Sequence, residues 1–596
     1  MRIMHIIELY LKIISNLRKH LSNRQFLIIS SIFVGLTAGI AAVALKTIVH
    51  YIQSLLTYDF NFRYNDYLYL VFPGIGIILT VTCVNYLLKN KFGRGAAHIL
   101  YYMSKKMSLL ERVTMYSHIL TSALTVGFGG SAGLEAPIVV TGAAIGSNYG
   151  RVNMFDYRDR TLLLACGSAA GIASIFDAPI AGVMFALEVL ISEAAMPAFI
   201  PLIIASATGA LCSKIILQQN ILLSFALTQP FNYHNVIYYI IMGVMAGFVS
   251  LYYAKVFGFI EALFKPLAAR NYAKAISAAL ILALLVFLLP PLFGEGYESI
   301  KFLASGHTEK LLQNSIFSAY AGNEWFVLMF IGAVMLVKAV ATSVTLGGGG
   351  NGGSFAPSLF VGAFMGFFFS RLLNLAGISI LPEANFTLVG MAGILSGVMY
   401  APLTGIFLIA EITGGYELMI PLMLVSSISY IIVKHFEPYS MDTKELALKG
   451  ELIRGNRDKA ILSLLHMQDI IETNFQTVPG TATMTELNAL ISHSKRNLFP
   501  VVDSNNNLIG IITLESIREI LFELDSFKDM PAIELMSKPV AVIQTGEEMD
   551  SIMAKFDSTG AWNLPVTDKG RYAGFISKSS IFAEYRTRLL TDFTDE

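Results

Sequence analysis

The sequence has little charge and almost no cysteine for its length. Of 596 residues, 14% are Asp, Glu, Lys or Arg, and only three are cysteine. Charge at that level is too low to cover the surface of a soluble protein of this size. The cysteines, Cys83, Cys166 and Cys212, all lie in apolar stretches. They predict neither a disulfide framework nor a metal site.

Two further absences narrow the function. The formal net charge is zero, which argues against nucleic acid as a partner and against an amphipathic protein that binds at a membrane surface. The sequence also contains no His/Cys cluster and no phosphate-binding P-loop. We therefore expect that the protein is not an enzyme.

Apolar residues make up 55% of the chain. Runs long enough to span a bilayer recur from about residue 26 to residue 435. Examples are Phe26–Val49, Tyr67–Leu87, Val236–Ala262, Ala273–Leu292 and Trp325–Val344. The pattern predicts an α-helical polytopic membrane protein.

The composition changes near residue 450, where the apolar runs stop and a polar tail with alternating strand and helix patterns begins. The predicted parts are an N-terminal interfacial helix (1–25), a membrane domain (26–440), a cytosolic linker (441–466) and two tail modules (467–523 and 532–586). The first apolar stretch has no small-residue cleavage site after it, so we expect Met1–His20 to be retained.

Basic residues flank the membrane domain at both ends. They are Arg18, Lys19 and Arg24 before the first span, and Lys444, Lys449, Arg454, Arg457 and Lys459 after the last. The positive-inside rule then places both termini in the cytosol, with the protein in a plasma or inner membrane.

The membrane domain contains an internal repeat. Gly129–Pro137 and Gly349–Pro357 both begin with Gly-Gly and end with Ala-Pro. Phe176–Glu188 and Met399–Glu411 both contain Ala-Pro followed nine residues later by a glutamate. The half repeats extend over about residues 110–217 and 325–435. Such repeats predict two halves around a central site that is built from broken helices.

The composition of these elements suggests an anion site. Glycine clusters let the backbone depart from a helix, and a proline at the first helical position starts one. The free N–H groups and the positive dipole of a helix N-terminus attract small anions. The alternative is that the glycines only allow helices to pack closely. Two matched elements favour the anion site.

At these residues the sequence resembles the CLC family of chloride channels and chloride/proton exchangers. Gly133–Pro137 is similar to the family's G(K/R)EGP motif, with Leu134 and Ala136 in place of the basic residue and second glycine. The resemblance implies that Glu135 is a gating glutamate that competes with the anion. It also implies anion contacts at Gly133 and Leu134.

Two other family motifs concern the central anion site. Gly353–Pro357 matches GxFxP, which implies anion contacts from Gly353, Ser354, Phe355 and Ala356, chiefly through the last two N–H groups. Gly93–Ala97 is similar to GSGIP and implies contacts from Gly93, Arg94 and Gly95. Arg94 replaces the serine of that motif. It either adds positive charge at the anion site, turns toward the cytosolic vestibule, or snorkels to the membrane edge.

Departures from the family bear on proton coupling and on the inner gate. The proton-glutamate position of family exchangers is Val189, which favours passive conduction. The central tyrosine position is Asp442, so either Tyr439 fills that role after a local shift or the inner gate is altered. We interpret Glu188 and Glu411 as structural, because they recur in both halves. We expect Lys338 to be a paired structural cation.

The tail contains a second duplication. Asn497–Asp503 with Leu508–Thr513 parallels Asn563–Asp568 with Tyr572–Ser577, and each predicts two strands joined by a turn and followed by a helix. The two modules resemble paired CBS domains, which often bind an adenine nucleotide. Ser516 and Ser580 replace the usual ribose-binding aspartates. A purely structural or dimer-contact role is the alternative.

The resemblance implies a CLC-type inverted repeat of broken helices with a cytosolic α/β CBS pair. It also implies a homodimer with a voltage- or pH-gated pathway for chloride or another small anion in each subunit. The alternatives are a chloride/proton antiporter, with protons as a second substrate, and a non-conducting sensor linked to the CBS pair. Membrane lipid is the expected surrounding in every case.

Overall fold

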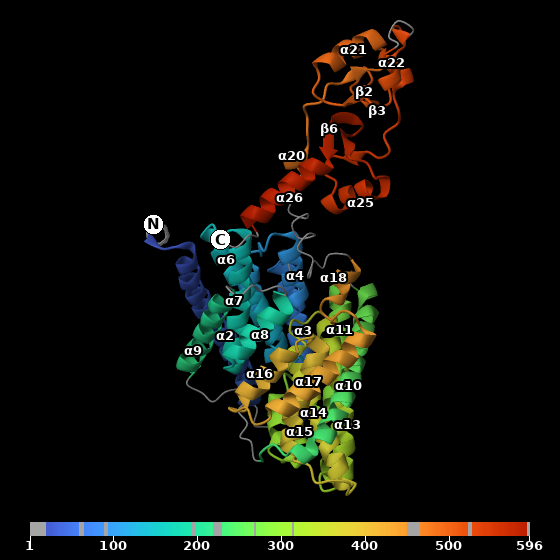
Figure 1. Ribbon diagram of the computed structural model, residues 1–596. Coiled ribbons are helices and arrows are strands. Elements are labelled where there is room, and N and C mark those ends of the chain that lie inside the picture. The colour runs from blue at the N-terminus through green and yellow to red at the C-terminus, as the bar shows by residue number, and fades with distance from the viewer. Residues whose placement is uncertain are drawn as a thin grey trace. The chain divides into compact units, whose positions relative to one another are not determined.

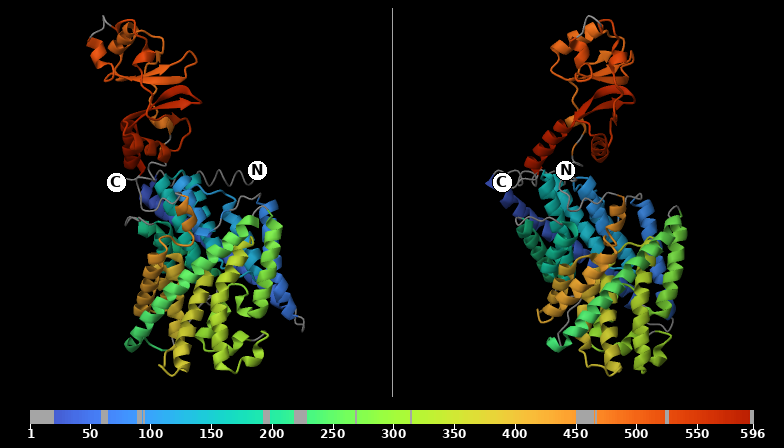
Figure 2. Two further views of the ribbon diagram at one scale, coloured as in Figure 1. Left: turned by 90° about the vertical axis from the view of Figure 1, so that its right-hand side faces the viewer. Right: turned by 45° about the vertical axis from the view of Figure 1, so that its right-hand side comes forward.

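The computed structural model divides the chain into two compact units, residues 1–452 and 453–596. It describes residues 20–58, 65–88, 93, 95–191, 198–217, 229–267, 270–312, 315–449, 465, 467–522 and 527–592. Figures 1 and 2 show the helical first unit and the smaller mixed second unit. Most of the predicted interfacial segment (1–25), Arg94 and most of the predicted linker lie outside the described residues, and α2 already begins at Asn23.

The first unit is almost entirely α-helical. Its longer helices are α2 (Asn23–Tyr58), α3 (Asn65–Tyr86), α4 (Gly95–Lys105), α5 (Thr114–Gly127), α6 (Glu135–Val152), α7 (Tyr157–Phe176), α9 (Phe199–Leu217), α10 (Val236–Phe264), α11 (Asn271–Leu288), α13 (Glu324–Gly347), α14 (Phe355–Leu375), α15 (Glu383–Met399), α16 (Pro402–Ile412) and α17 (Met419–Phe436). Shorter ones are α8 (Pro179–Phe185), α12 (Tyr297–Ala304) and α18 (Lys444–Leu448).

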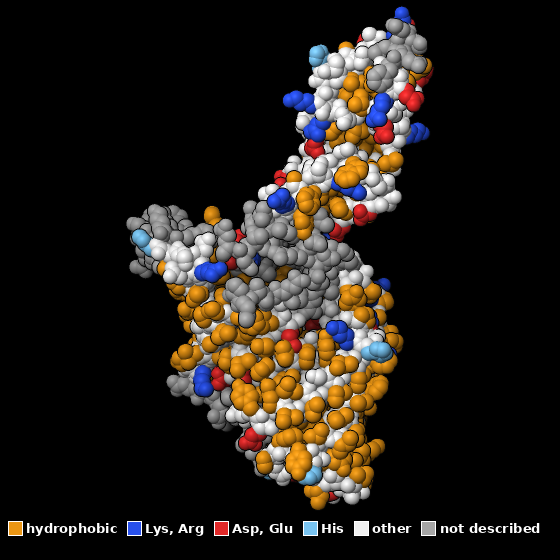
Figure 3. Space-filling view, in the orientation of Figure 1, with side chains coloured by type: hydrophobic (Ala, Val, Ile, Leu, Met, Phe, Trp, Pro, Cys, Tyr) orange, Lys and Arg blue, Asp and Glu red, His pale blue; other side chains and the backbone are white. Residues whose placement is uncertain are grey.

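Among the described residues, eight helices are long and apolar enough to cross a membrane. Hydrophobic side chains cover most of the visible face of this unit (Figure 3). Among the exposed hydrophobic side chains of this unit are Leu280 and Ile216, which are 69% and 52% exposed. Apolar exposure on this scale requires lipid as the surrounding solvent. The predicted polytopic helical fold is confirmed.

The repeat is visible as two similar sets of helices. Helices α5 to α9 correspond in order to α13 to α17, and Figures 1 and 2 show the cyan-to-green set beside the yellow-to-orange set. Within each set, two helices cross at a glycine pair. A Cβ on Gly142 would lie 2.1 Å from the Gly167 carbonyl oxygen, and one on Gly362 would lie 2.4 Å from that of Gly390. Glycines at these crossings serve close helix packing.

The four Ala-Pro elements begin helices in two ways. Pro179 and Pro402 stand at the first position of α8 and α16, as predicted. Two residues before each proline, Asp177 and Tyr400 have a left-handed backbone conformation. The prediction is wrong for α6 and α14, which begin two residues before Pro137 and Pro357. Proline is tolerated there because the first four N–H groups of a helix have no partner within it.

The second unit consists of two modules of the same topology. Strands β1 (Val478–Pro479), β2 (Leu498–Val502) and β3 (Leu508–Thr513) form one sheet; β4 (Ile543–Gln544), β5 (Asn563–Asp568) and β6 (Arg571–Ser577) form the other. In each sheet the first pairing is parallel and the second antiparallel. The helices are α20 (Met467–Ile470), α21 (Met484–His493), α22 (Arg518–Phe522), α24 (Ala532–Leu535), α25 (Met549–Thr559) and α26 (Lys578–Asp592).

Each antiparallel pair has a register shift at the equivalent place, between Val501 and Val502 and between Val566 and Thr567. The two modules touch through their turns, where the Leu508 N–H donates to the Gly570 carbonyl over 3.1 Å. The predicted strand-turn-strand pattern of each tail module is confirmed.

Candidate functional site

The two Gly-rich breaks meet at the centre of the first unit. The Gly133 N–H donates to the Gly353 carbonyl over 2.9 Å, and the Gly353 N–H donates to the Gly133 carbonyl over 2.8 Å. This pair of bonds is a one-residue antiparallel bridge between the repeats. Helices α6 and α14 each begin two residues after their bridging glycine, so the N-termini of both helices lie next to this bridge.

Glu135 lies across this junction. Its side chain is 1% exposed. One carboxylate oxygen accepts a hydrogen bond from the Tyr297 hydroxyl, and the other lies 3.4 Å from the Ala356 N–H. A carboxylate from the first repeat therefore rests on the helix N-terminus of the second. That N–H is one of the two donors predicted for an anion.

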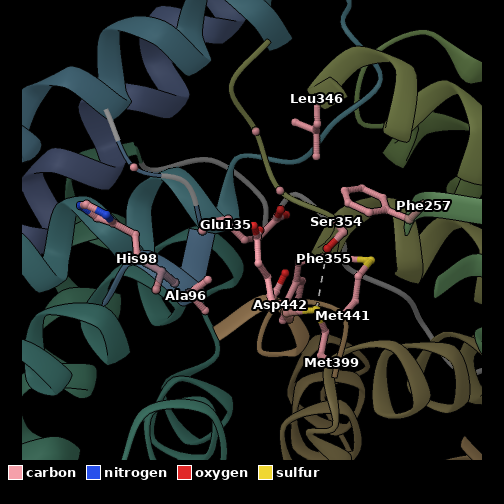
Figure 4. Close-up of a pocket in the computed structure, with 18 of the residues that line it drawn as sticks. Ala96, His98, Glu135, Phe257, Leu346, Ser354, Phe355, Met399, Met441 and Asp442 are labelled. Carbon is pink, nitrogen blue, oxygen red and sulfur yellow. Dashed lines mark hydrogen bonds between the residues drawn. The ribbon is translucent and has the colours of Figure 1, made fainter. Parts of the chain in front are cut away.

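A cavity of about 490 Å³ leads up to Glu135. Its lining includes five other predicted site residues: Gly93, Gly95, Gly353, Ser354 and Phe355. Figure 4 shows Glu135, Ser354, Phe355 and Asp442 around the same space, with the Ser354 hydroxyl bonded to the Met399 sulfur over 3.9 Å. Among the described residues, the lining does not include Gly133, Leu134 or Ala356, which lie at or near the bridge between the two repeats.

Asp442, not Tyr439, lines this cavity. Tyr439 is 43% exposed and is not among the described residues that line the cavity, so the structure does not bring it to the site. Asp442 is half-buried and lines the cavity. Burial, followed by the neighbouring charge of Glu261, raises the pKa of Asp442 to about 6.

The residues around Asp442 also correct the predicted linker. Met441, Asp442, Glu445 and Leu446 line the cavity, and α18 begins at Lys444. This segment is therefore part of the membrane unit. Sequence reasoning placed it outside because its charged residues end the last apolar run, although the chain returns to cover the cavity.

Several lining residues were missed by the sequence analysis. His98 lies in the first turn of α4, and a Cβ on Gly93 would lie 1.8 Å from its Nδ1 atom. Phe257 and Glu261 come from the distant helix α10. The spacing of His98 after Gly95 was a usable signal, since both belong to the same turn. Nothing in the local sequence marks Phe257 or Glu261.

The shared glutamates cap helices across the repeat. Glu188 accepts hydrogen bonds from the Leu403 and Thr404 N–H groups at 2.8 and 2.7 Å, at the start of α16. Glu411 does the same for Ile180 and Ala181 at 2.9 and 2.8 Å, at the start of α8. A carboxylate is well suited to this place because it satisfies unpaired N–H groups and the helix dipole. These contacts support the structural interpretation of both acids.

Two other predicted positions are buried. Val189 is 6% exposed and lies in the π-helical turn Ala186–Leu190 that follows α8. The Lys338 ammonium donates to the Gly294 carbonyl at 2.9 Å and the Leu292 carbonyl at 3.4 Å, and it lies 4.6 Å from the centre of the Phe360 ring. Carbonyl and aromatic contacts allow a buried cation to remain in place.

In the second unit, the serines at the ribose-aspartate positions close tight turns. The Ser516 N–H donates to the Thr513 side-chain oxygen over 3.0 Å, and the Ser580 N–H donates to that of Ser577 over 2.9 Å. Neither residue carries the charge that would bind a ribose hydroxyl pair. This arrangement supports the structural alternative for the CBS pair.

Comparison with known proteins identifies both units. The family model described as voltage gated chloride channel matches residues 75–434, and the CBS domain model matches residues 467–523. A ClcB-like protein of Ralstonia nicotianae is 28% identical over 375 residues, which cover 61% of this chain and 81% of the relative. The match to the voltage gated chloride channel model spans more than half of the chain.

Solved structures agree in fold. A slow cyanobacterial Cl⁻/H⁺ antiporter aligns with a TM-score of 0.61 at 21% identity, over 73% of this chain and 100% of its own. A CLC-type fluoride/proton antiporter aligns with a TM-score of 0.57 at 24% identity, over 70% and 96% of the two chains. The fold, the family match and the repeat agree: the protein belongs to the CLC family of integral membrane anion transporters and carries a C-terminal CBS region.

Proposed function

We propose that this chain transports chloride, or another small anion, along the cavity that ends at Glu135, and that Glu135 is the gate. The observation that carries the proposal is the contact between the Glu135 carboxylate and the Ala356 N–H. A helix N-terminus that holds a carboxylate can hold a halide in its place. Anion and side chain then compete for one donor.

Movement of Glu135 opens the pathway in this proposal. When the carboxylate is neutralised by a proton or swings away, the Ala356 N–H becomes free to bind the anion together with the neighbouring Phe355 N–H. Gly353, Ser354 and Phe355 already line the cavity below, so an anion leaving the gate meets further donors. Voltage or pH would act on this step.

The proposed mode is passive conduction through each subunit of a homodimer in a plasma or inner membrane. The support is Val189, a buried apolar residue at the position where family exchangers carry a proton-transferring glutamate. A valine cannot accept a proton. The Ralstonia relative is also named for a chloride channel.

Proton-coupled exchange is the second candidate, and Asp442 favours it. This carboxyl group lines the same cavity as Glu135 and titrates near neutral pH, so it can accept a proton where Val189 cannot. Both solved structures named above are antiporters in their titles. Under this candidate, Asp442 and Glu135 mark two ends of a proton route.

Chloride efflux from proteoliposomes, recorded together with external pH, tests both modes. Glu135→Gln, which mimics the protonated acid, should raise chloride flux or uncouple it from protons and should abolish its dependence on external pH. Glu298→Gln is the control, because Glu298 is an exposed acid on the neighbouring helix α12. Efflux without proton movement in the wild type supports conduction, whereas coupled proton movement supports exchange.

Unchanged flux and unchanged pH dependence in Glu135→Gln would contradict the gating role. If the wild type moves no chloride, fluoride or nitrate, the remaining interpretation is a non-conducting sensor linked to the CBS region.

A further inference from the structure

A second acid, Glu295, lies beside the gate and has no role in the proposed mechanism. One of its carboxylate oxygens accepts a hydrogen bond from the Leu134 N–H over 3.2 Å. Leu134 immediately precedes α6 and is one of the residues predicted to contact the anion. The carboxylate therefore occupies a donor at the N-terminus of α6, just as Glu135 occupies one at the N-terminus of α14.

The turn that carries Glu295 is held from both repeats. Gly294 and Gly296 have φ values of +62° and +87°, which only glycine adopts readily, so Glu295 projects from a sharp bend. The Gly294 N–H donates to the Gly129 carbonyl over 2.9 Å, and the Gly294 carbonyl accepts from Lys338. The position of Glu295 is therefore set by the Gly-rich break of the first half and by α13 of the second.

The charges that act on Glu295 come from three elements. Glu135 on α6 acts on it as a like charge, and Lys46 on α2 and Lys338 on α13 act as opposite charges. Tyr297, at the start of α12, donates its hydroxyl to Glu135. Glu295 is therefore subject to one like charge and two opposite charges. Lys46 and Lys338 offset part of the cost of placing this half-buried carboxylate beside Glu135.

Glu295 lies next to the gate but not in the cavity wall. Among the described residues, the cavity lining includes Glu135 but neither Glu295 nor Tyr297. The N–H that Glu295 occupies belongs to Leu134, the residue directly before Glu135. We propose that Glu295 is a second acidic gate, which competes with the anion for the Leu134 N–H and repels it electrostatically. This inference rests on the proposed anion pathway through Glu135.

Chloride binding to the detergent-solubilised full chain, measured by titration calorimetry with potassium chloride, tests the inference. Because burial, and then the like charge of Glu135, raises the pKa of Glu295 to about 8, binding is measured at about pH 9, where the carboxylate is charged. Glu295→Gln removes that charge and should tighten chloride binding by roughly tenfold, equivalent to about 1.4 kcal/mol. Glu298→Gln, which removes an exposed acid three residues away, should leave affinity unchanged. Glu295→Asp keeps the charge but shortens the reach to the Leu134 N–H, so its affinity should lie between those of wild type and Glu295→Gln.

A purely structural role predicts a different result. In that case Glu295→Gln lowers the unfolding temperature, because Lys46 and Lys338 lose their counter-charge, and chloride affinity stays at or below that of the wild type. That result overturns the inference. If Glu295→Gln does not fold, unchanged affinity in Glu295→Asp overturns it equally.

The two gates can be separated by flux. If Glu135→Gln raises chloride efflux and Glu295→Gln changes neither efflux nor affinity, only the second gate is wrong. If neither substitution changes efflux or affinity, the proposed pathway itself fails.

Discussion

The two repeats of the membrane unit have similar backbone folds but different side chains where they meet. Glu135 and Phe355 occupy equivalent positions, two residues after the bridging glycines Gly133 and Gly353. The first places a carboxylate on the N-terminus of the other half, and the second forms part of the cavity wall. Residues shared by both halves build the junction, whereas the residue that differs, Glu135, supplies the carboxylate of the proposed gate.

The same comparison separates two kinds of acid. Glu188 and Glu411 recur in both halves, and each caps a helix of the opposite half. Glu135 and Glu295 have no acidic counterpart of this kind, and both lie at the centre. Repetition therefore marks structural acids, and its absence marks candidate functional ones.

The largest expected effect comes from removing a shared acid. Glu188→Ala and Glu411→Ala each leave two N–H groups at a helix start without a partner, which costs about 1–3 kcal/mol per group. Denaturant unfolding in detergent should show both variants destabilised by similar amounts, roughly 2–6 kcal/mol. A loss of stability in only one of them would break the symmetry between the halves.

Loss of coupled or gated flux without loss of stability in either variant would contradict their structural role. Glu135→Gln provides the contrast, because it should change flux while leaving the unfolding midpoint close to that of the wild type.

A smaller effect on chloride flux is expected from Asp442, which stands at the position of the family's central tyrosine. With a pKa of about 6, Asp442 is neutral below that pH and negatively charged above it. The charge repels anions, so wild-type chloride flux should fall as the pH of the Asp442 side rises from 5 to 7. Asp442→Asn should lose this step and should carry roughly threefold to tenfold more chloride at pH 7, since repulsion of about 1 kcal/mol is involved.

Flux measured at a series of pH values on that side checks the prediction, with Glu417→Gln as the control, because Glu417 is an exposed acid that does not line the cavity. An identical pH profile in Asp442→Asn would show that another group sets the inner gate.

The smallest effect is expected in the second unit, whose modules also repeat. Ser516 and Ser580 occupy equivalent turns, and each closes its turn by a hydrogen bond. The two modules therefore have the same uncharged turn residue where a nucleotide-binding CBS domain has an aspartate. Adenosine triphosphate at millimolar concentration should leave the thermal unfolding of the full chain unchanged. A clear rise in unfolding temperature would instead assign an adenine nucleotide to the CBS pair.

Much of the architecture could be predicted because it depends on local patterns. Apolar runs indicated the spans, and the matched Gly-Gly and Ala-Pro elements indicated two halves that meet at broken helices. The error at Pro137 and Pro357 arose because a helix start tolerates proline at several positions. The error at Tyr439 arose because side-chain direction on an irregular segment depends on tertiary packing. Arg94 lies outside the described residues, so its role stays a prediction.

The sequence by itself determined that this is a membrane protein with two halves, a central site at glycine breaks and a CBS-like tail. Those features follow from composition, periodicity and repetition along the chain. Only the tertiary structure decided that Glu135 rests on the Ala356 N–H, that Asp442 faces the cavity, and that Glu295 reaches the Leu134 N–H. Each of the two hydrogen bonds joins residues more than 150 positions apart, and no local pattern encodes which distant groups will meet.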